Sequence, residues 1–352
     1  MISFIVPIKY DSKNYIYYRA LALIDYFSKI VYDVELIILD SSKNKLVYSN
    51  SSKVKIVKLN YEKKIYSPAK ARNECIHFST KEFLFFLDVD LSFSDTFVKA
   101  LLNLIHKEFV KSNKKFIMLP CLYLSKEGTQ YFESQSSTQD LLNKFKKSYM
   151  IGENSFVERL AVNTSAILLR KKYFIEIGMF DEDFNGHGGE DFELLHRLAA
   201  NSPHSKKGND YYLDKVESFP INYTGFRKYM SYYSFEYLFT DLVLVHRWHE
   251  RKLFNKFYFQ RVKNESKLIE KMKTYDNLHK HKIWYAKNNM VDYEQFLKNI
   301  VKQSDIEPSK AIGLYKLRSD QNFQRPLSAK IRKLITRPNL FFSDMLNNLK
   351  VK

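Results

Sequence analysis

Two carboxylates, Asp88 and Asp90, directly follow the apolar run at residues 83–87. A short apolar run of this kind is typical of a buried strand, so both side chains would stand at a strand end with one residue between them. Carboxylate oxygens are the ligands that Mg²⁺ and Mn²⁺ prefer, often together with substrate phosphates. The triplet therefore predicts a divalent metal site, with Asp90 as the direct ligand and Asp88 bound to ribose or to the metal through water. The alternative is a solvated turn.

A second acidic pair follows a glycine pair in the run Asn-Gly-His-Gly-Gly-Glu-Asp at residues 185–191. Gly188 and Gly189 would let a ligand approach the backbone closely. Glu190 and Asp191 would stand in the first turn of a helix, where the helix dipole favours an ionised carboxylate. Such a carboxylate beside an acceptor hydroxyl is what a general base requires. The alternative is a helix cap without catalytic function.

A histidine completes the candidate metal site. His246 ends the apolar run 242–245, where a neutral imidazole could join Asp90 around one ion. His249 lies three residues further on and competes for the same function. The alternative for either ring is a structural position on an apolar face.

Strand and helix patterns alternate through the first 250 residues. Continuous apolar strands that alternate with helices indicate a largely parallel sheet covered by helices on both faces, that is, an α/β fold. The segment 128–152 is more polar, and we expect it to form a loop over the site. Strands are predicted at 2–7, 34–39, 54–59, 83–87, 116–120, 166–169 and 242–245, and helices at 15–30, from Ser67-Pro68, at 93–110, 173–177 and 190–200.

Sheets of this kind bind ligands beyond the carboxyl ends of their strands. Asp40 ends the second predicted strand, as Asp88 and Asp90 end the fourth. We therefore expect these carboxylates to converge on one rim of the sheet.

Length and composition limit the classes of protein to consider. The 352 residues, 45% of them hydrophobic, suffice for one large domain with an appendage or for two domains. The formal charge of +18 is compatible with binding to nucleic acid, to an anionic membrane or to a polyanion. Because no DNA- or RNA-binding motif accompanies this charge, we predict no nucleic-acid partner. Cys75 and Cys121 lack metal-type spacing and are expected to be buried and reduced.

Neither a signal peptide nor an apolar stretch of about 18 residues is evident, which favours a cytosolic protein. We predict a domain at 1–250, with a nucleotide-binding half at 1–125 and an acceptor and catalytic half at 126–250. A basic helical extension at 251–305 and a linker with an amphipathic basic tail at 306–352 would follow. This tail is either a packed helix or an interfacial helix on an anionic bilayer.

Together these motifs resemble the inverting GT-A-fold glycosyltransferases of family 2, which include bacterial capsule and O-antigen transferases. The second half is similar to the C-terminal region shared by β-1,4-galactosyltransferases, polypeptide GalNAc-transferases and chondroitin polymerase. The resemblance covers about residues 1–250. It rests on Phe4-Ile5-Val6-Pro7, Asp40, Pro68-Ala69-Lys70-Ala71-Arg72-Asn73, Asp88-Val89-Asp90, Phe180-Asp181-Glu182 with Gly188-Gly189-Glu190-Asp191, and His246.

The resemblance implies functions for the residues of the nucleotide-binding half. Pro7 and Asp40 would line a uracil pocket, with Asp40 bonded to the base. Arg72 and Asn73 would face the diphosphate or the donor sugar. Asp88 and Asp90 would hold ribose and Mn²⁺ or Mg²⁺, with His246 as the further metal ligand.

For the second half, the resemblance implies that Asp191 is the catalytic base and that Glu190 contacts the donor or acceptor sugar. Relatives usually carry Trp where this chain has His187, so the aromatic platform for the acceptor would be weaker or supplied by Phe184.

The expected reaction moves a hexose or N-acetylhexosamine from a UDP-sugar to a growing surface polysaccharide, of capsule or lipopolysaccharide type. The acceptor would be a glycan or a lipid-linked glycan, and the tail would hold the enzyme on the cytoplasmic face of an anionic inner membrane. The alternatives are a non-catalytic glycan-binding protein on a transferase-like fold and a polyanion-binding module.

Overall fold

The computed structural model describes residues 1–315 except 45, 49–50, 61–64, 111, 136–137, 154, 215–218, 251–254, 281–282, 287–288 and 290. It also describes residues 331, 333–335, 338, 341 and 342. Most of the predicted amphipathic tail therefore lies outside the described residues.

A sheet with the strand order β3-β2-β1-β4-β7-β6-β8-β5 forms the centre of the fold. Strands β1 to β4 run parallel, while β7 pairs antiparallel with both β4 and β6, and β5 pairs antiparallel with β8. The mixed α/β architecture with a mostly parallel sheet confirms the predicted GT-A fold class. The strands are β1 Ile2–Ile8, β2 Val34–Asp40, β3 Val54–Lys58, β4 Phe83–Phe86, β5 Leu91–Ser92, β6 Phe116–Leu124, β7 Val157–Arg170 and β8 Leu244–His246.

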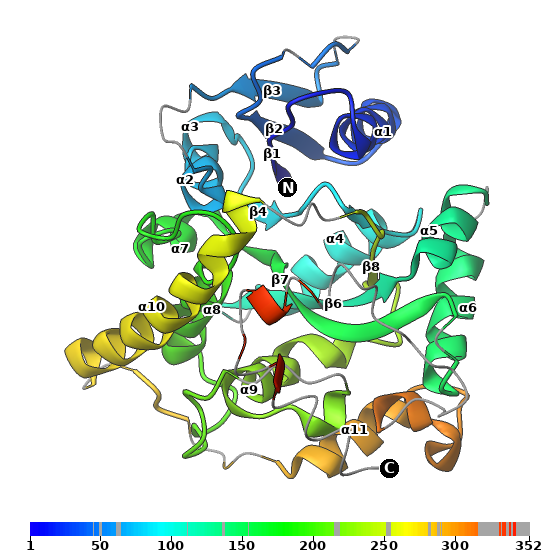
Figure 1. The fold of residues 1–352 in the computed structure, drawn as a ribbon, viewed down its shortest axis with the longest axis vertical. Helices are drawn as coiled ribbons and strands as arrows, with labels where there is room; N and C mark the ends of the chain where they lie inside the picture. The colour runs from blue at the N-terminus through cyan, green and yellow to red at the C-terminus, as the bar shows by residue number, and fades with distance from the viewer. Residues whose placement is uncertain are drawn as a thin grey trace.

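Helices cover both faces of the sheet, as the continuous apolar strands predict (Figure 1). Alternate residues of one strand enter different cores: Phe4 packs with α1 and α4, whereas Ile5 packs with α2, α3, α8 and α10. A third core joins α6, α9 and α11 to β6, β7 and β8. The helices of these three cores are α1 Tyr15–Lys29, α2 Pro68–Asn73, α3 Cys75–Phe78, α4 Phe97–Glu108, α6 Thr138–Met150, α8 Glu190–Asn201, α9 Gly225–Ser234, α10 Lys256–His279 and α11 Tyr293–Val301.

The predicted loop at 128–152 is wrong. This segment lies mostly in α5 Lys126–Glu133 and in α6, which stand together at one side of the molecule (Figure 1). In α6 the apolar side chains Leu141, Leu142, Phe145, Tyr149 and Met150 are buried. Their spacing of three or four residues is that of an amphipathic helix, although many polar residues surround them.

The strands β6 and β7 are longer than predicted. Strand β6 continues four residues past Pro120, and its pairing with β7 shifts register between Met118 and Pro120. Proline lacks a ladder donor and is found at such irregularities, so it marks a bulge here rather than the strand end. The remaining short elements are α7 Lys171–Glu176 and the 3-10 turns Pro220–Asn222, Phe235–Tyr237, Pro308–Lys310 and Ile312–Leu314.

The C-terminal segments pack on the α/β core. Helix α10 runs beside α8 (Figure 1) and contributes Leu268 and Met272 to the core below it. Leu297 of α11 and Leu314 are fully buried in the third core. Residues 256–314 are therefore an integral part of the fold as far as the structure describes them.

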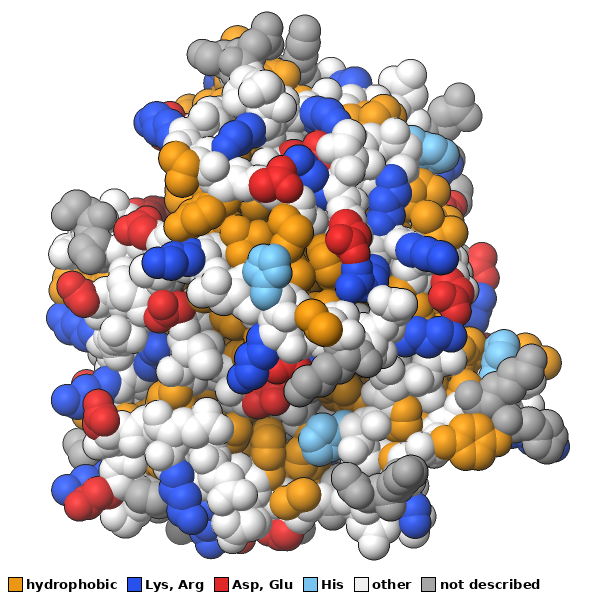
Figure 2. Space-filling view, turned by 180° about the vertical axis from the view of Figure 1, so that it is seen from behind, with side chains coloured by type: hydrophobic (Ala, Val, Ile, Leu, Met, Phe, Trp, Pro, Cys, Tyr) orange, Lys and Arg blue, Asp and Glu red, His pale blue; other side chains and the backbone are white. Residues whose placement is uncertain are grey.

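The positive charge is dispersed on the face of the molecule that Figure 2 shows. Figure 2 shows Lys and Arg side chains spread over one face and interspersed with Asp and Glu. Cys75 and Cys121 are buried, as expected, and form no disulfide with any described residue. No described helix combines the length and the apolar character that crossing a bilayer would take.

Candidate active site

One cleft of about 640 Å³ collects most of the predicted site residues. It opens at the carboxyl ends of β1 and β4, and the first turns of α8 and α10 form its opposite side. Nine of the predicted site residues line it: Pro7, Arg72, Asp88, Asp90, Gly188, Gly189, Glu190, Asp191 and His246.

Asp90, His246 and His249 form a candidate metal centre. One potential ligand atom from each of the three lies within 4.8 Å of the others. The short antiparallel pair β5 and β8 creates this arrangement, because Leu91 pairs with His246 and the backbone of Arg247 donates to the Asp90 carbonyl oxygen at 2.9 Å. Both histidines considered from the sequence therefore meet at Asp90, whereas Asp88 is not part of this group.

The residues around the centre hold the ligands in place. Arg19 donates to Asp90 Oδ1 at 2.8 Å, which leaves Oδ2 on the side of His249, 3.4 Å from Nε2. The His249 ring stacks on Tyr15 and the His246 ring on Tyr123, with ring centres 4.7 and 4.5 Å apart. These contacts restrict both imidazoles before any ion binds.

The donor set fits a divalent transition metal. One carboxylate and two imidazoles supply mixed oxygen and nitrogen ligands, and imidazole favours transition ions over Mg²⁺, which prefers oxygen. Of the two metals expected from the sequence, Mn²⁺ therefore fits this site better than Mg²⁺.

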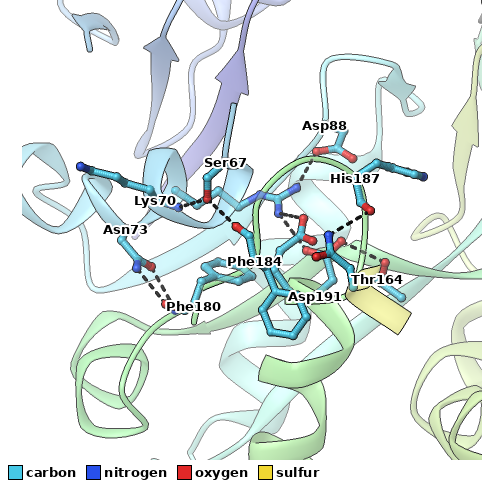
Figure 3. A network of polar contacts seen from close by, with 12 residues as sticks. Ser67, Lys70, Asn73, Asp88, Thr164, Phe180, Phe184, His187 and Asp191 are labelled. Atoms are coloured by element: carbon cyan, nitrogen blue, oxygen red, sulfur yellow. Dashed lines mark hydrogen bonds and ion pairs between the residues drawn. The ribbon is translucent and has the colours of Figure 1, made fainter. Parts of the chain in front are cut away.

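Arg72 is the centre of a second group, which contains the acidic pair of α8. Its guanidinium contacts Asp88 Oδ1 at 2.8 Å, Glu190 Oε1 at 3.2 Å and Asp191 Oδ1 at 2.8 Å. Thr164 donates to the other Asp191 oxygen at 3.2 Å (Figure 3). Arg72 thus binds three carboxylates from two separate segments, Asp88 after β4 and the Glu190–Asp191 pair of α8, and is a positioning residue here.

The loop before α8 aligns the acidic pair. Gly189 has φ = 104°, a conformation that favours glycine, and a Cβ at this residue would lie 2.6 Å from the Phe184 ring. Ser67, at the start of α2, donates to the Phe184 carbonyl oxygen at 2.8 Å (Figure 3). This bond fixes the N-terminal end of α2, the helix that carries Arg72, to the loop that leads into α8 and Glu190.

The carboxylates of α8 do not act as helix caps. The N-cap is Gly189, and no side chain caps this helix end. The predicted dipole effect is also outweighed: burial and the neighbouring Asp191 raise the pKa of Glu190 to about 8, and burial raises the pKa of Asp191. Glu190 is the more deeply buried of the two and its Oε2 has no hydrogen-bond partner. A proton shared by the pair therefore belongs on Glu190, which leaves Asp191 ionised.

The structure does not bring two predicted residues to the cleft wall. Asp40 is 1% exposed and accepts from Ser42 N at 2.8 Å. Asn73 donates to the Phe180 carbonyl oxygen at 2.9 Å and to Glu182 at 3.0 Å, and it accepts from Phe180 N. In this conformation Asn73 joins α2 to the turn before α8, and both residues serve local structure.

The suggested aromatic platform at Phe184 is not available, because this ring is 1% exposed beneath Gly189. Aromatic side chains of α10 line the cleft instead. The His187 ring lies 5.8 Å from Phe257 and 5.3 Å from Tyr258. The sequence pattern gave no sign of these contacts, because α10 looked like a peripheral extension.

Arg19, Thr164 and the aromatic partners of the histidines are the other site residues that sequence reasoning missed. Each stands within a regular helix or strand, where its residue type alone carries no functional signal. Their importance follows from contacts across 27 to 234 residues of sequence.

The fold and the site match a known family. The family model described as "Glycosyltransferase like family 2" matches residues 3–274. The chain therefore belongs to this family of sugar-transferring enzymes, and it is a transferase. A search of curated proteins gave no match.

Solved structures with a similar fold include S. aureus TarS 1–349, with 17% identity over 56% of this chain and 54% of that chain, and a TM-score of 0.35. The mannosyltransferase PcManGT from Pyrobaculum calidifontis, in complex with GDP-Man and Mn²⁺, is 11% identical over 98% of this chain and 83% of that chain, with a TM-score of 0.38. GalNAc-T7 with UDP, GalNAc and Mn²⁺ has 11% identity, coverage of 86% and 53%, and a TM-score of 0.38. The first match spans about half of the TarS fragment.

Proposed function

We propose that this glycosyltransferase is a metal-dependent, inverting enzyme that moves a hexose or N-acetylhexosamine from a UDP-sugar to a glycan hydroxyl. The observation that carries the proposal is the presence of two groups in one cleft. Asp90, His246 and His249 could hold a metal ion, and Arg72 aligns Glu190 and Asp191.

Asp90, His246 and His249 would hold the ion. When bound, such an ion would supply positive charge that offsets the charge developing on the departing nucleoside diphosphate. The Asp88 side chain is 44% exposed while it contacts Arg72, so its second oxygen is open to the ribose or a metal-bound water. Pro7 and the residues after β1 would border the nucleotide.

Asp191 acts as the base in this scheme. Its carboxylate lies at the cleft wall, is held by Arg72 and Thr164, and is kept ionised because Glu190 carries the shared proton. It takes the proton of the acceptor hydroxyl as the oxygen bonds to the anomeric carbon. The bond between that carbon and the diphosphate breaks on the opposite face, which inverts an α-linked donor to a β-glycoside.

The test is a donor screen that measures UDP release from a panel of UDP-sugars with Mn²⁺, with and without an extract of surface glycans. General bases contribute about 10²–10⁴-fold to rate, so Asp191→Asn should lower turnover by that factor while UDP binding persists. Full transfer activity in Asp191→Asn would overturn the assignment of the base. Absence of UDP release with every donor would favour a non-catalytic glycan-binding protein.

We further propose that the acceptor belongs to a surface polysaccharide of capsule or lipopolysaccharide type and that the enzyme is peripheral on the cytoplasmic face of an anionic inner membrane. Four exposed apolar side chains in the described part of the tail support membrane contact: Ile331, Leu334, Ile335 and Phe342. Sedimentation with anionic vesicles should be lost when the residues after Gln324 are deleted. Unchanged sedimentation of this truncated protein would contradict the membrane proposal.

A further inference from the structure

One wall of the cleft carries three arginines from three different elements. Arg159 stands on β7, Arg227 on α9 and Arg261 on α10. Arg159 and Arg227 are 68 positions apart in the sequence, and Arg227 and Arg261 are 34 positions apart, but all three reach the same wall. None of them belongs to the metal or carboxylate groups described above.

The position of this arginine wall relates it to the acceptor side. The Arg227 guanidinium lies 4.6 Å over the ring of Phe192, the residue that follows Asp191. The Arg159 guanidinium lies 4.1 Å over the ring of Tyr123, which stacks on His246. The wall therefore extends from the neighbour of the base to the neighbour of the metal centre, alongside the position where the acceptor would attack.

The charge of the arginine wall is only partly balanced. Arg227 Nε pairs with Asp214 at 2.7 Å, and Arg261 Nε pairs with Glu265 at 3.0 Å. Arg159 has no carboxylate within ion-pair distance among the residues that the structure describes. Three cations thus face two anions, and both ion pairs use Nε rather than the terminal nitrogens that bind oxyanions in a bidentate manner.

The other arginines of the cleft region are bound differently. Arg72 contacts three carboxylates and is 3% exposed, and Arg19 contacts Asp90 and the Trp248 carbonyl oxygen. Side chains of the arginine wall are more open, with 20% of Arg227 and 35% of Arg261 exposed. Burial lowers the pKa of Arg261, and the repulsion from Arg159 contributes to this shift in a smaller measure. An anion bound here would relieve this repulsion.

We propose that Arg159, Arg227 and Arg261 bind an oxyanion, a carboxylate or phosphate group, on the acceptor sugar beside the hydroxyl that is glycosylated. This inference rests on the proposed function, and it narrows the acceptor to acidic glycans. The same chemistry could come from a donor that carries a uronic acid, so the experiment separates these two sources.

The experiment compares three p-nitrophenyl acceptors: a β-glucuronide, a β-galactoside 6-phosphate and the neutral β-glucoside. Wild type should use at least one anionic acceptor with a kcat/KM at least ten times that of the glucoside. Arg159→Gln and Arg261→Gln should raise the KM for the anionic acceptor at least ten-fold and leave the glucoside unchanged. Arg159→Lys should recover part of the loss, since it keeps the charge but not the guanidinium fork.

Controls separate the possible outcomes. Lys99→Gln removes one exposed positive charge on α4, away from the cleft, and should behave as wild type. Arg159→Gln should unfold at the same temperature as wild type, which excludes misfolding as the cause of a raised KM. A change in donor KM without a change in acceptor KM would assign the oxyanion to the donor and overturn the proposal, as would equal use of neutral and anionic acceptors by wild type.

Direct binding keeps the inference testable if no donor is hydrolysed. Saturation-transfer NMR should detect p-nitrophenyl β-glucuronide on wild type, with the signal lost in Arg159→Gln and at high salt. If the glucuronide binds wild type while no UDP-sugar is hydrolysed, the result would contradict the proposed function but not the anion site. Equal binding of the glucuronide to wild type and to Arg159→Gln would contradict the anion site but not the proposed function.

Discussion

Replacement of Glu190 by Gln should stabilise the ligand-free protein at neutral pH. Glu190 is 4% exposed at the side chain and lies in the first turn of α8 beside Asp191. Burial and the charge of Asp191 raise its pKa from 4.5 to about 8, although Arg72 partly opposes this shift. Gln has the shape of the protonated acid and carries no charge, so it removes the cost of ionising or protonating this group.

The sign and size follow from proton linkage. Because the folded pKa is raised, the folded state binds more protons than the unfolded state between pH 4.5 and 8, and stability falls as pH rises through this window. At pH 7, which is about 2.5 units above the unfolded pKa of Glu190, ionisation in the unfolded state lowers the unfolding free energy by about 3 kcal/mol, at about 1.36 kcal/mol per unit. At pH 5 the same loss of unfolding free energy is about 1 kcal/mol. Since Glu190 Oε2 has no hydrogen-bond partner among the described residues, the NH2 group of Gln would be left unsatisfied there, which would offset about 1 kcal/mol of the gain.

The assay is urea unfolding of wild type and Glu190→Gln at pH 5, 6, 7 and 8 in EDTA, without nucleotide. The gain in unfolding free energy should grow with pH and reach about 2 kcal/mol at pH 7. A matched variant, Glu250→Gln, removes a carboxylate from the cleft rim and should show a flat difference. Parallel pH profiles for wild type and Glu190→Gln, or a less stable variant at pH 8, would refute the reasoning.

Three further variants test the loop, the α2 end and the metal centre. Gly189→Ala should lower the unfolding free energy by at least about 2 kcal/mol, since it combines an unfavourable φ with a clash against the Phe184 ring. Gly188→Ala is the matched control: its φ is 83° but nothing lies within 4 Å of an added Cβ, so urea unfolding should show a smaller loss of about 1 kcal/mol. Asn73→Ala should lower the melting temperature but leave the donor KM unchanged, and a raised KM with unchanged melting would restore the predicted nucleotide contact. His249→Ala should weaken Mn²⁺ binding by at least ten-fold in a titration followed by electron paramagnetic resonance, and an unchanged Mn²⁺ affinity would remove His249 from the metal centre.

The parallel half of the fold could be predicted from the sequence because its signals are local. The strands β1, β2 and β4 are predominantly apolar, and carboxylates mark the ends of two of them: Asp40 is the last residue of β2, and Asp88 closely follows β4. The segment around α6 was mistaken for a loop because its apolar spacing is diluted by Lys, Gln and Ser. Strand β7 was found only in part, since residues 157–165 mix polar and apolar types.

Most residues of the candidate site could be predicted from the sequence, but the contacts between them could not. Asp90 and His246 could be expected at strand ends, whereas the pairing of β5 with β8 that joins them is a contact across more than 150 residues. Arg72 was expected to face a ligand, but its two terminal nitrogens bind three carboxylates of the protein, from the end of β4 and the start of α8. The arginine wall depends on α10 folding back over the cleft, which no local pattern indicates.

Calorimetry of UDP binding with and without Mn²⁺ tests the central claim most directly. If Asp90, His246 and His249 hold the ion that grips the diphosphate, Mn²⁺ should tighten UDP binding to the wild-type protein at least ten-fold. The same titration with the His246→Ala, His249→Ala double variant should show no effect of Mn²⁺. An equal affinity for UDP in Mn²⁺ and in EDTA would contradict the account.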